Sequence, residues 1–320
     1  MHKLIVRLLV CISAVFGMIA PSDVSAAGSL PKELRIDYTD YNQLSLVLKK
    51  FGWLEKEFQA DNVPVSWVYS TGSTQGLKDL AGGSVDFAST SALPCLLCKV
   101  QGRPVKPVYI FSHPEWVTLL VTRDSPINSV LGLKGKKIAV TPDSDPYVFL
   151  LQALNEAGLC KSDIQIIPMS LSEGRQALEM QQVDAWAGSD PFISSSQLEL
   201  GSRAIYRNAA FNGYGLLNTT ESFAARYPEA VTRVIKVYER VRKWAIRHPD
   251  ELALIYADES GISLQIAKLI LSRIDFSQTI PDSGDIEGLK EALPILVQER
   301  MLNNRTEAES LIQHFDVKVN

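Results

Sequence analysis

Four short segments of the chain carry hydroxyl, glycine or aspartate residues directly after a run of apolar residues. They are residues 69–74 (YSTGST), 89–91 (STS), 141–147 (TPDSDPY) and 187–192 (AGSDPF). Each segment precedes a stretch with helical spacing of apolar residues. A helix begins with unpaired backbone N–H groups and the positive end of its dipole, which together can bind an anion. Hydroxyl side chains at that position either donate to an anion or cap the helix.

Each segment taken alone is more typical of a helix cap, which every α/β protein needs, but the recurrence of four raises the chance of a shared ligand site. In sheets with parallel strands, ligands bind outside the carboxyl ends of the strands, where such segments would converge. In VDFASTSALP (residues 85–94) the three hydroxyls lie between a predicted strand and a predicted helix. We expect Ser89 and Thr90 to hold an anionic head group and Ser91 to cap the following helix.

Strands and helices are predicted to alternate through the first two hundred residues. Expected strands are residues 32–39, 63–70, 84–89, 104–112, 116–123, 133–142, 164–170 and 183–189, and expected helices are 43–58, 94–101, 146–159 and 173–182. The chain after residue 226 is mostly helical in pattern. This order predicts an α/β architecture with largely parallel sheets.

The composition indicates a globular protein large enough for two compact lobes. The chain has 320 residues, of which 46% are apolar and 21% charged. Its formal net charge is −4 and it contains no basic block, so nucleic acid is not an expected partner.

Residues 1–26 have the pattern of a secretory signal peptide. Lys3 and Arg7 precede an apolar run over residues 8–20, and small residues before Ala26 provide a cleavage site. The apolar run is shorter than the roughly 20 residues of a membrane-spanning helix. We therefore expect cleavage after Ala26 and a soluble protein exported to the periplasm.

Catalytic, cofactor and metal motifs are missing from the sequence. It contains neither the G-x-S-x-G pentapeptide of serine hydrolases nor a P-loop, and residues 213–218 lack the third glycine of a dinucleotide-binding loop. Cys95 and Cys98 form a CxxC inside an apolar helical run, which is more typical of core residues than of a redox or zinc site. We expect a protein that is not an enzyme and that binds no metal and no cofactor.

Several longer segments resemble a known family. They are residues 83–90, residues 124–140 (DSPINSVLGLKGKKIAV), the helix 149–159 and residues 182–192 (QVDAWAGSDPF). They resemble the periplasmic solute-binding proteins of ABC importers, in the aliphatic-sulfonate, taurine and nitrate group. The resemblance covers nearly all of the chain after the signal peptide.

The resemblance implies a type II periplasmic-binding-protein fold, in which two α/β lobes close on a ligand held between them. The first lobe would comprise residues 27–121 and the returning segment 216–320, and the second lobe residues 122–215. The two crossovers between the lobes would lie near residues 118–124 and 213–219. The partners implied are a small anionic ligand and the permease subunits of an ABC importer, with the binding protein itself a monomer.

The family's ligand loops map onto the segments described above. The resemblance implies a ligand site formed by Tyr41, Thr71, Gly72, Ser73, Ser89, Thr90, Ser144, Asp145, Tyr147, Trp186 and Asp190. Hydroxyls and helix N–H groups would bind a sulfonate without a buried arginine, because each hydrogen bond to a charged group contributes roughly 1.5–3 kcal/mol.

Two departures from the family pattern leave the ligand open. Asp143 and Asp145 flank Ser144, where they could cap a helix or bind an amine or hydroxyl of the ligand. Gly188 and Ser189 replace a bulkier pair and would leave room for a larger organic tail. Aryl sulfonates, sulfate esters, zwitterionic sulfonates, taurine, nitrate and thiamine-pyrimidine precursors stay open as ligands. So does a sensory role in which the protein presents its ligand to a membrane receptor.

Overall fold

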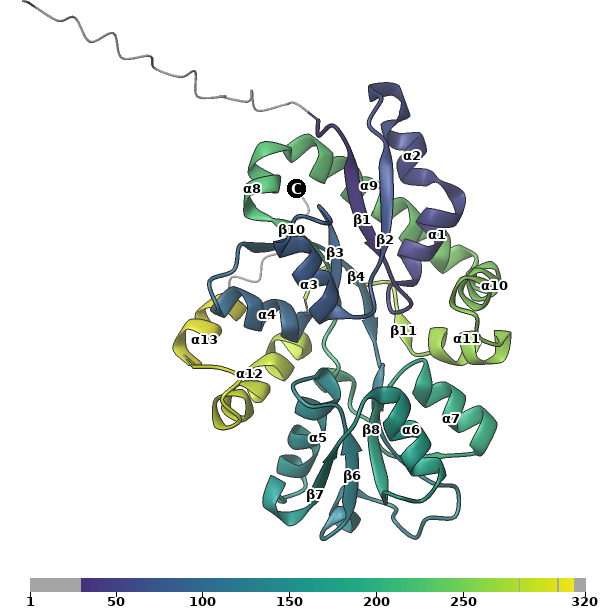
Figure 1. The fold of residues 1–320 in the computed structure, drawn as a ribbon, viewed down its shortest axis with the longest axis vertical. Helices are drawn as coiled ribbons and strands as arrows, with labels where there is room; N and C mark the ends of the chain where they lie inside the picture. Colours follow the sequence, from purple (N-terminus) through teal and green to yellow (C-terminus); the bar gives the residue numbers. More distant parts are fainter. Residues whose placement is uncertain (1–29, 282, 304, 314–320) are drawn as a thin grey trace, which may run out of the picture.

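The computed structural model describes residues 30–281, 283–303 and 305–313, so the predicted signal peptide lies outside the described residues. The chain forms two α/β lobes, drawn one above the other in Figure 1. The expected two-lobe α/β architecture is therefore confirmed.

The first lobe, at the top of Figure 1, is built on two small groups of strands. β1 (Leu34–Tyr38) pairs with β2 (Val65–Tyr69) in parallel, and a single bridge from Ile36 to Phe87 joins this pair to the other strands. The second group has the order β11-β4-β10-β3. Its members are β3 (Ala88–Ser91), β4 (Val105–Pro114), β10 (Gly215–Thr220) and β11 (Ile274–Asp275).

Helices from both ends of the chain surround these strands. They are α1 (Gln43–Phe51), α2 (Trp53–Phe58), α3 (Ser73–Ala81), α4 (Ala92–Val100), α8 (Glu221–Arg226), α9 (Pro228–Arg247), α10 (Pro249–Ser260), α11 (Leu264–Leu271), α12 (Ser283–Gln298) and α13 (Arg305–Gln313). The expected single helix over residues 43–58 is divided into α1 and α2, because Gly52 adopts a left-handed conformation with φ of +61°.

The second lobe is one five-stranded sheet of order β7-β6-β8-β5-β9. The strands are β5 (Val117–Val121), β6 (Lys137–Val140), β7 (Gln165–Pro168), β8 (Ala185–Ser189) and β9 (Arg203–Tyr206). Its helices are α5 (Asp145–Glu156), α6 (Leu171–Glu179) and α7 (Phe192–Leu200). Short 3₁₀ turns elsewhere are η1 (Gln59–Asp61), η2 (Val130–Leu133), η3 (Lys161–Asp163) and η4 (Ala209–Phe211).

Neither lobe is built on a largely parallel sheet, which corrects that expectation: the sheet of the second lobe is mixed, and the β11-β4-β10-β3 group of the first lobe is antiparallel throughout. β6 is parallel to β7 and β8, but β5 runs antiparallel to β8 and β9, and β10 runs antiparallel to β3 and β4. The antiparallel strands include those next to the crossovers. A strand that enters a lobe directly from the other lobe has no crossover helix to set it parallel to its neighbours.

The chain passes between the lobes earlier than expected. β4 belongs to the first lobe and β5 to the second, so the first crossover is residues 115–116. The return runs from the end of β9 to the start of β10, over residues 207–214. The expected crossovers, near residues 118–124 and 213–219, fall largely on β5 and β10 themselves. The apolar runs predicted as hinges are β5 and β10, which are interior strands of their sheets.

Trp186 fills the core of the second lobe between its sheet and α6. Its side chain is fully buried, with 0% exposure, and packs with Leu120, Ala139 and Leu178. A Cβ atom on Gly188 would lie 2.4 Å from the indole, and one on Gly174 of α6 would lie 2.6 Å from its nitrogen. Gly188 therefore makes room for Trp186 and not for a ligand, and Trp186 is a core residue in this conformation.

We expect Gly188→Ala to lower the free energy of unfolding by about 1–3 kcal/mol, because the new methyl group overlaps the Trp186 ring. Urea unfolding followed by fluorescence measures the change. Gly82→Ala is the matched control. Gly82 is exposed with φ of −79°, and we expect its replacement to change stability by less than about 0.5 kcal/mol. A Gly188→Ala protein as stable as the wild type would contradict this packing.

Candidate functional site

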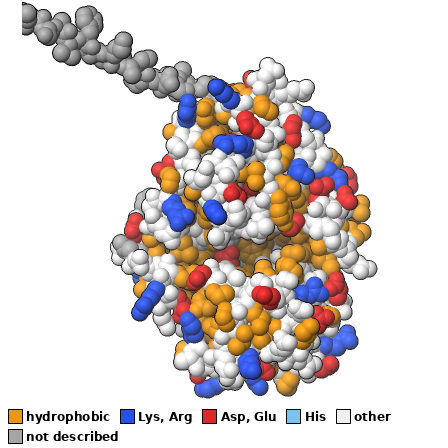
Figure 2. Space-filling view, viewed as in Figure 1, with side chains coloured by type: hydrophobic (Ala, Val, Ile, Leu, Met, Phe, Trp, Pro, Cys, Tyr) orange, Lys and Arg blue, Asp and Glu red, His pale blue; other side chains and the backbone are white. Residues whose placement is uncertain are grey.

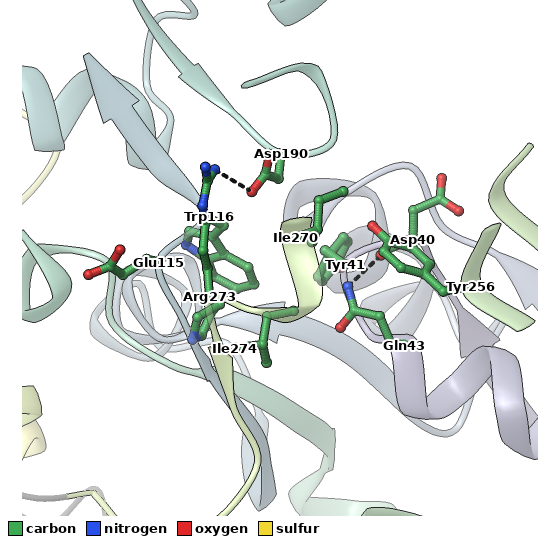
Figure 3. Close-up of a pocket in the computed structure, with 11 residues that line it drawn as sticks. Asp40, Tyr41, Gln43, Glu115, Trp116, Asp190, Tyr256, Ile270, Arg273 and Ile274 are labelled. Atoms are coloured by element: carbon green, nitrogen blue, oxygen red, sulfur yellow. Dashed lines mark hydrogen bonds and ion pairs between the residues drawn. The ribbon is translucent and has the colours of Figure 1, made fainter. Parts of the chain in front are cut away.

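A small pocket of about 20 Å³, partly open to solvent, lies at the junction of the two lobes. Figure 2 shows the molecule hollowed between the lobes, with apolar side chains on both rims. The residues that line the pocket come from both lobes and from the first crossover (Figure 3); they are Asp40, Tyr41, Gln43, Pro114, Glu115, Trp116, Asp190, Tyr256, Ile270, Arg273 and Ile274. Of the predicted site residues, Tyr41 and Asp190 lie in this lining.

Ser89 and Thr90 do not lie in a loop. They belong to β3, where they pair with Leu217 and Leu216 of β10, and both are fully buried. The Ser89 hydroxyl donates to Asp37 Oδ1 (2.8 Å) and accepts from Asn42 (2.9 Å), and Thr90 accepts from Asn218 (2.8 Å). Both hydroxyls already have protein partners, so their predicted contact with an anion has no support in this geometry.

Asp37, at the end of β1, was not predicted as a site residue. Its side chain is 1% exposed, and its carboxylate accepts hydrogen bonds from the Ser89 backbone N–H (2.7 Å) and the Ser89 hydroxyl (2.8 Å). Burial raises the pKa of Asp37 to about 7, although the two hydrogen bonds from Ser89 act in the opposite direction. The only sequence signal for this residue is an aspartate inside an otherwise apolar strand.

Tyr41, Ser70, Ser73 and Ser91 form a group on the first lobe that we call the hydroxyl cluster. The Tyr41 hydroxyl donates to the Ser89 carbonyl (2.6 Å) and lies beside Ser70 and Ser73. Ser73 accepts from the Ser91 backbone N–H at 2.9 Å. Burial keeps the pKa of Tyr41 well above its ordinary value, so its hydroxyl keeps its proton.

The hydroxyl cluster adjoins the start of α3. The Gly76 N–H bonds to the Gly72 carbonyl and begins the hydrogen bonding within this helix. The backbone N–H groups that come before Gly76 have no acceptor within the helix. Gly72 provides no side-chain cap, its Cβ position faces open space, and Thr71 is exposed. The predicted loop over residues 71–73 thus lies next to Tyr41 and Ser91.

Ser91 and Asp145 join the two lobes across the cleft. The Ser91 hydroxyl donates to Asp145 Oδ2 at 2.7 Å and makes no capping bond to α4, which corrects its predicted role as a cap. Burial raises the pKa of Asp145 to about 6, and the hydrogen bond from Ser91 partly offsets this rise. Asp145 therefore faces the hydroxyl cluster from the second lobe.

The other predicted residues of the second lobe have structural partners. Ser144, and neither neighbouring aspartate, caps α5 by accepting from the Tyr147 N–H at 3.4 Å. Tyr147 donates to Glu299 (2.5 Å) and does not line the pocket. Asp190 accepts from the Ser194 N–H (2.9 Å), and burial raises its pKa. The structure thus brings Asp145 and Asp190 to the cleft but not Ser144, Tyr147 or Trp186.

Arg273 is the main site residue that the sequence did not reveal. It follows α11 in the first lobe and reaches α7 of the second, where it donates to Gln197 (2.7 Å) and Ser194 (3.3 Å). Its guanidinium lies 3.9 Å from Asp190, and burial lowers its pKa (Figure 3). No motif surrounds Arg273, because tertiary packing alone brings it to the cleft.

We expect Ser89→Ala to lower the free energy of unfolding by about 1–3 kcal/mol, with a larger loss at pH 8 than at pH 5. In the wild type the Ser89 hydroxyl stabilises the ionised form of Asp37. This form is populated in the folded protein only at pH values above the pKa of Asp37, which is about 7. Urea unfolding at both pH values measures the loss, and Ser84→Ala, at an exposed position, is the control. Equal losses at both pH values would contradict the role of the carboxylate.

No helix within the described part of the chain is long and apolar enough to cross a membrane. Comparison with known proteins finds relatives that match most of the chain. An aliphatic sulfonates-binding protein of Bacillus subtilis (strain 168) is 25% identical over 316 residues, which cover 97% of this chain and 95% of that protein. A second aliphatic sulfonates-binding protein, from Escherichia coli (strain K12), is 33% identical over 206 residues, 63% of each chain.

A solved structure with the same fold is the alkanesulfonate-binding protein SsuA from Xanthomonas axonopodis pv. citri bound to MOPS. It is 25% identical, superposes with a TM-score of 0.76, and the match covers 88% of this chain and 99% of that one. A family model described as NMT1/THI5 like matches residues 52–252, which is more than half of the chain. The chain therefore belongs to the NMT1/THI5-like family.

Proposed function

We propose that this protein is the periplasmic solute-binding component of an ABC importer and that it captures an organosulfonate anion. The names of its relatives support the ligand class. The observation that carries the proposal is the start of α3 on the first lobe, beside Ser73, where the first backbone N–H groups have no acceptor within the helix. A sulfonate stays ionised at physiological pH and needs hydrogen-bond donors of this kind.

The sulfonate would bind at the start of α3, beside Ser73 and Tyr41. The hydroxyl of Ser73 accepts from the Ser91 N–H, and its own proton has only a long contact of 3.4 Å to the Ser91 hydroxyl, which a sulfonate oxygen would replace. Helix N–H groups add donors with the positive end of the dipole behind them. This position differs from the predicted one at Ser89 and Thr90, whose hydroxyls are occupied within the first lobe.

Delivery to a permease would follow closure of the lobes around the ligand. Within the described residues two stretches of chain, 115–116 and 207–214, connect the sheets. The lobes meet through polar contacts such as Ser91 with Asp145 and through the packing of α12 on α5. Such an arrangement permits hinge motion, and permease subunits would recognise the closed form. Presentation to a sensor receptor uses the same motion, and complex formation with a purified permease distinguishes transport from sensing.

A thermal-shift screen tests the ligand class. We expect alkanesulfonates at millimolar concentration to raise the melting temperature by several degrees, because a ligand at 100 times its Kd adds about 2.7 kcal/mol. In titration calorimetry, Ser73→Ala should weaken binding about tenfold, since it removes one hydrogen bond to an anion.

Ser84→Ala is the matched control for Ser73→Ala, because Ser84 is exposed and outside the cleft. Mass spectrometry should recover the sulfonate unchanged after incubation, as expected for a binding protein. A shift from nitrate or a thiamine precursor, with none from any sulfonate, would overturn the ligand class. Undiminished binding by Ser73→Ala would place the sulfonate elsewhere in the cleft.

Binding of a plain alkanesulfonate should strengthen as the pH falls. Asp145 and Asp37, with pKa values raised to about 6 and about 7, adjoin the proposed sulfonate position and repel an anion when ionised. Protonation removes this repulsion, so we expect the Kd of butane-1-sulfonate to fall roughly three- to tenfold from pH 8 to pH 5.5. Calorimetry at both pH values measures the change, and Asp145→Asn should reduce it. A Kd independent of pH would show that neither carboxylate acts on the ligand.

A further inference from the structure

Helix α12 packs on both lobes at once, at the level where the lobes meet (Figure 1). On the first lobe its apolar side chains belong to the same buried cluster as those of α4 and β10, with the members Leu289, Ala292, Leu293 and Leu296. On the second lobe, Ile295 belongs to the buried cluster around α5. One helix therefore takes part in the hydrophobic cores of both lobes.

The start of α12 is fixed to the first lobe and to the return crossover. Asp285 pairs with His113 at the end of β4, with 2.9 Å between the carboxylate oxygen and Nε2. A Cβ atom on Gly288 would overlap the carbonyl oxygen of Ala210 in η4, so the helix lies directly on the backbone of the crossover. Beyond α12, helix α13 packs on α4 of the first lobe. We therefore expect α12 to stay with the first lobe when the second lobe rotates.

The end of α12 reaches the second lobe through Glu299, the residue that follows the helix. Its carboxylate accepts from the Tyr147 hydroxyl of α5 (2.5 Å) and forms an ion pair with Lys161 of η3. The side chain of Glu299 is 12% exposed. Burial acts to raise the pKa of Glu299, but the hydrogen bonds from Lys161 and Tyr147 outweigh this effect and lower it, so the carboxylate is ionised at neutral pH.

The helix that α12 contacts, α5, also carries the second-lobe side of the cleft. Asp145 at its start accepts from the Ser91 hydroxyl across the cleft at 2.7 Å. Further along α5, Val148 belongs to the buried cluster of the first lobe, and the Gln152 amide donates to the Gly288 carbonyl of α12 (3.4 Å). Rotation of the second lobe away from the first would draw α5 from α12 and break these contacts. They therefore favour the conformation in which the two lobes meet.

We propose that α12 is a strap that holds the second lobe against the first before any ligand binds, and that Glu299 is the positioning residue that fastens it. The small volume of the pocket at the junction, about 20 Å³, agrees with lobes that already lie close together. Ligand would enter when the strap releases, and the strap thereby determines the ratio of closed to open protein in the absence of ligand. This inference does not depend on which ligand the cleft binds.

The distance between two spin labels tests the strap without any ligand. The labels are attached at Lys78→Cys on α3 of the first lobe and at Asn155→Cys on α5 of the second, both exposed positions. Cys160→Ser removes an exposed native thiol, whereas Cys95 and Cys98 are buried. Pulsed electron–electron double resonance measures the distribution of label distances. We expect one main distance in the ligand-free protein, because the strap holds the lobes together.

Two variants release the strap from opposite sides. Glu299→Gln removes the charge at the end of α12, and Lys161→Met removes the ammonium group from the second lobe. Each should shift the ratio of the two populations about tenfold towards a second, open distance, the effect of one charge-assisted hydrogen bond. Glu287→Gln is the matched control, because Glu287 is exposed on the same helix and pairs with Lys290 of α12. Thermal unfolding verifies that all variants are folded.

The outcomes separate the strap from the proposed function. One unchanged main distance in both variants overturns the strap, and so does an equal shift from Glu287→Gln. A wild type that populates both distances equally without ligand overturns it as well, because its lobes are then not held together. Butane-1-sulfonate should return both variants to the wild-type distance. If the ligand-free shifts appear but this sulfonate closes neither variant, the strap stands and the proposed ligand class is overturned.

Discussion

The buried contact between Asp37 and Ser89 organises the wall of the cleft on the first lobe. It joins the end of β1 to β3 through two hydrogen bonds, and Ser89 in turn holds Asn42, the N-cap residue of α1. Gly76 of α3 approaches the same point so closely that a Cβ there would lie 2.9 Å from the Ser89 carbonyl. Three strand-to-helix connections therefore converge on the Asp37 carboxylate. A buried carboxylate is tolerated here because its oxygens accept hydrogen bonds from Ser89.

This convergence explains why the donors that can face a ligand are not the most conspicuous hydroxyls in the sequence. The hydroxyls of Ser89 and Thr90 have partners within the first lobe, whereas Ser73 and the first N–H groups of α3 lie at the edge of the cleft. The hydroxyl cluster is held in place by backbone groups of β3, so its geometry is set before a ligand arrives. Preorganised donors bind an anion without the entropic cost of ordering side chains.

The cleft combines opposite electrostatic requirements. Donors from the first lobe suit a sulfonate, while Asp145 and Asp190 from the second lobe present carboxylates that burial makes reluctant to ionise. The two lobes also touch through Arg273, which extends from the first lobe to Gln197 on α7. The charges of the cleft therefore bear on ligand choice together with the shape of the pocket.

Local sequence patterns predicted much of the fold correctly. The alternation of strands and helices, the position of α5 and its first-turn Pro146, and the burial of Cys95 and Cys98 all follow from residue type and spacing. These features depend on neighbours within a few residues, and the resemblance to a family supplied the two-lobe arrangement. The helix break at Gly52 was not predicted. The crossovers were predicted at the wrong residues, because an apolar strand next to a hinge has the same pattern as any buried strand.

The roles of individual side chains at the cleft were decided by tertiary structure. Trp186 and Gly188 suggested a roomy pocket, yet they are two residues apart on one face of β8 and fill each other's space. Arg273 and Asp37 carry no local motif, and their importance arises from contacts with residues far away in the chain. The sequence by itself determined which residues form strands and helices and the class of protein they build. Only the folded chain determined which polar atoms are consumed by the protein and which are left for a ligand, because hydrogen-bond partners across a cleft are not encoded at any fixed spacing.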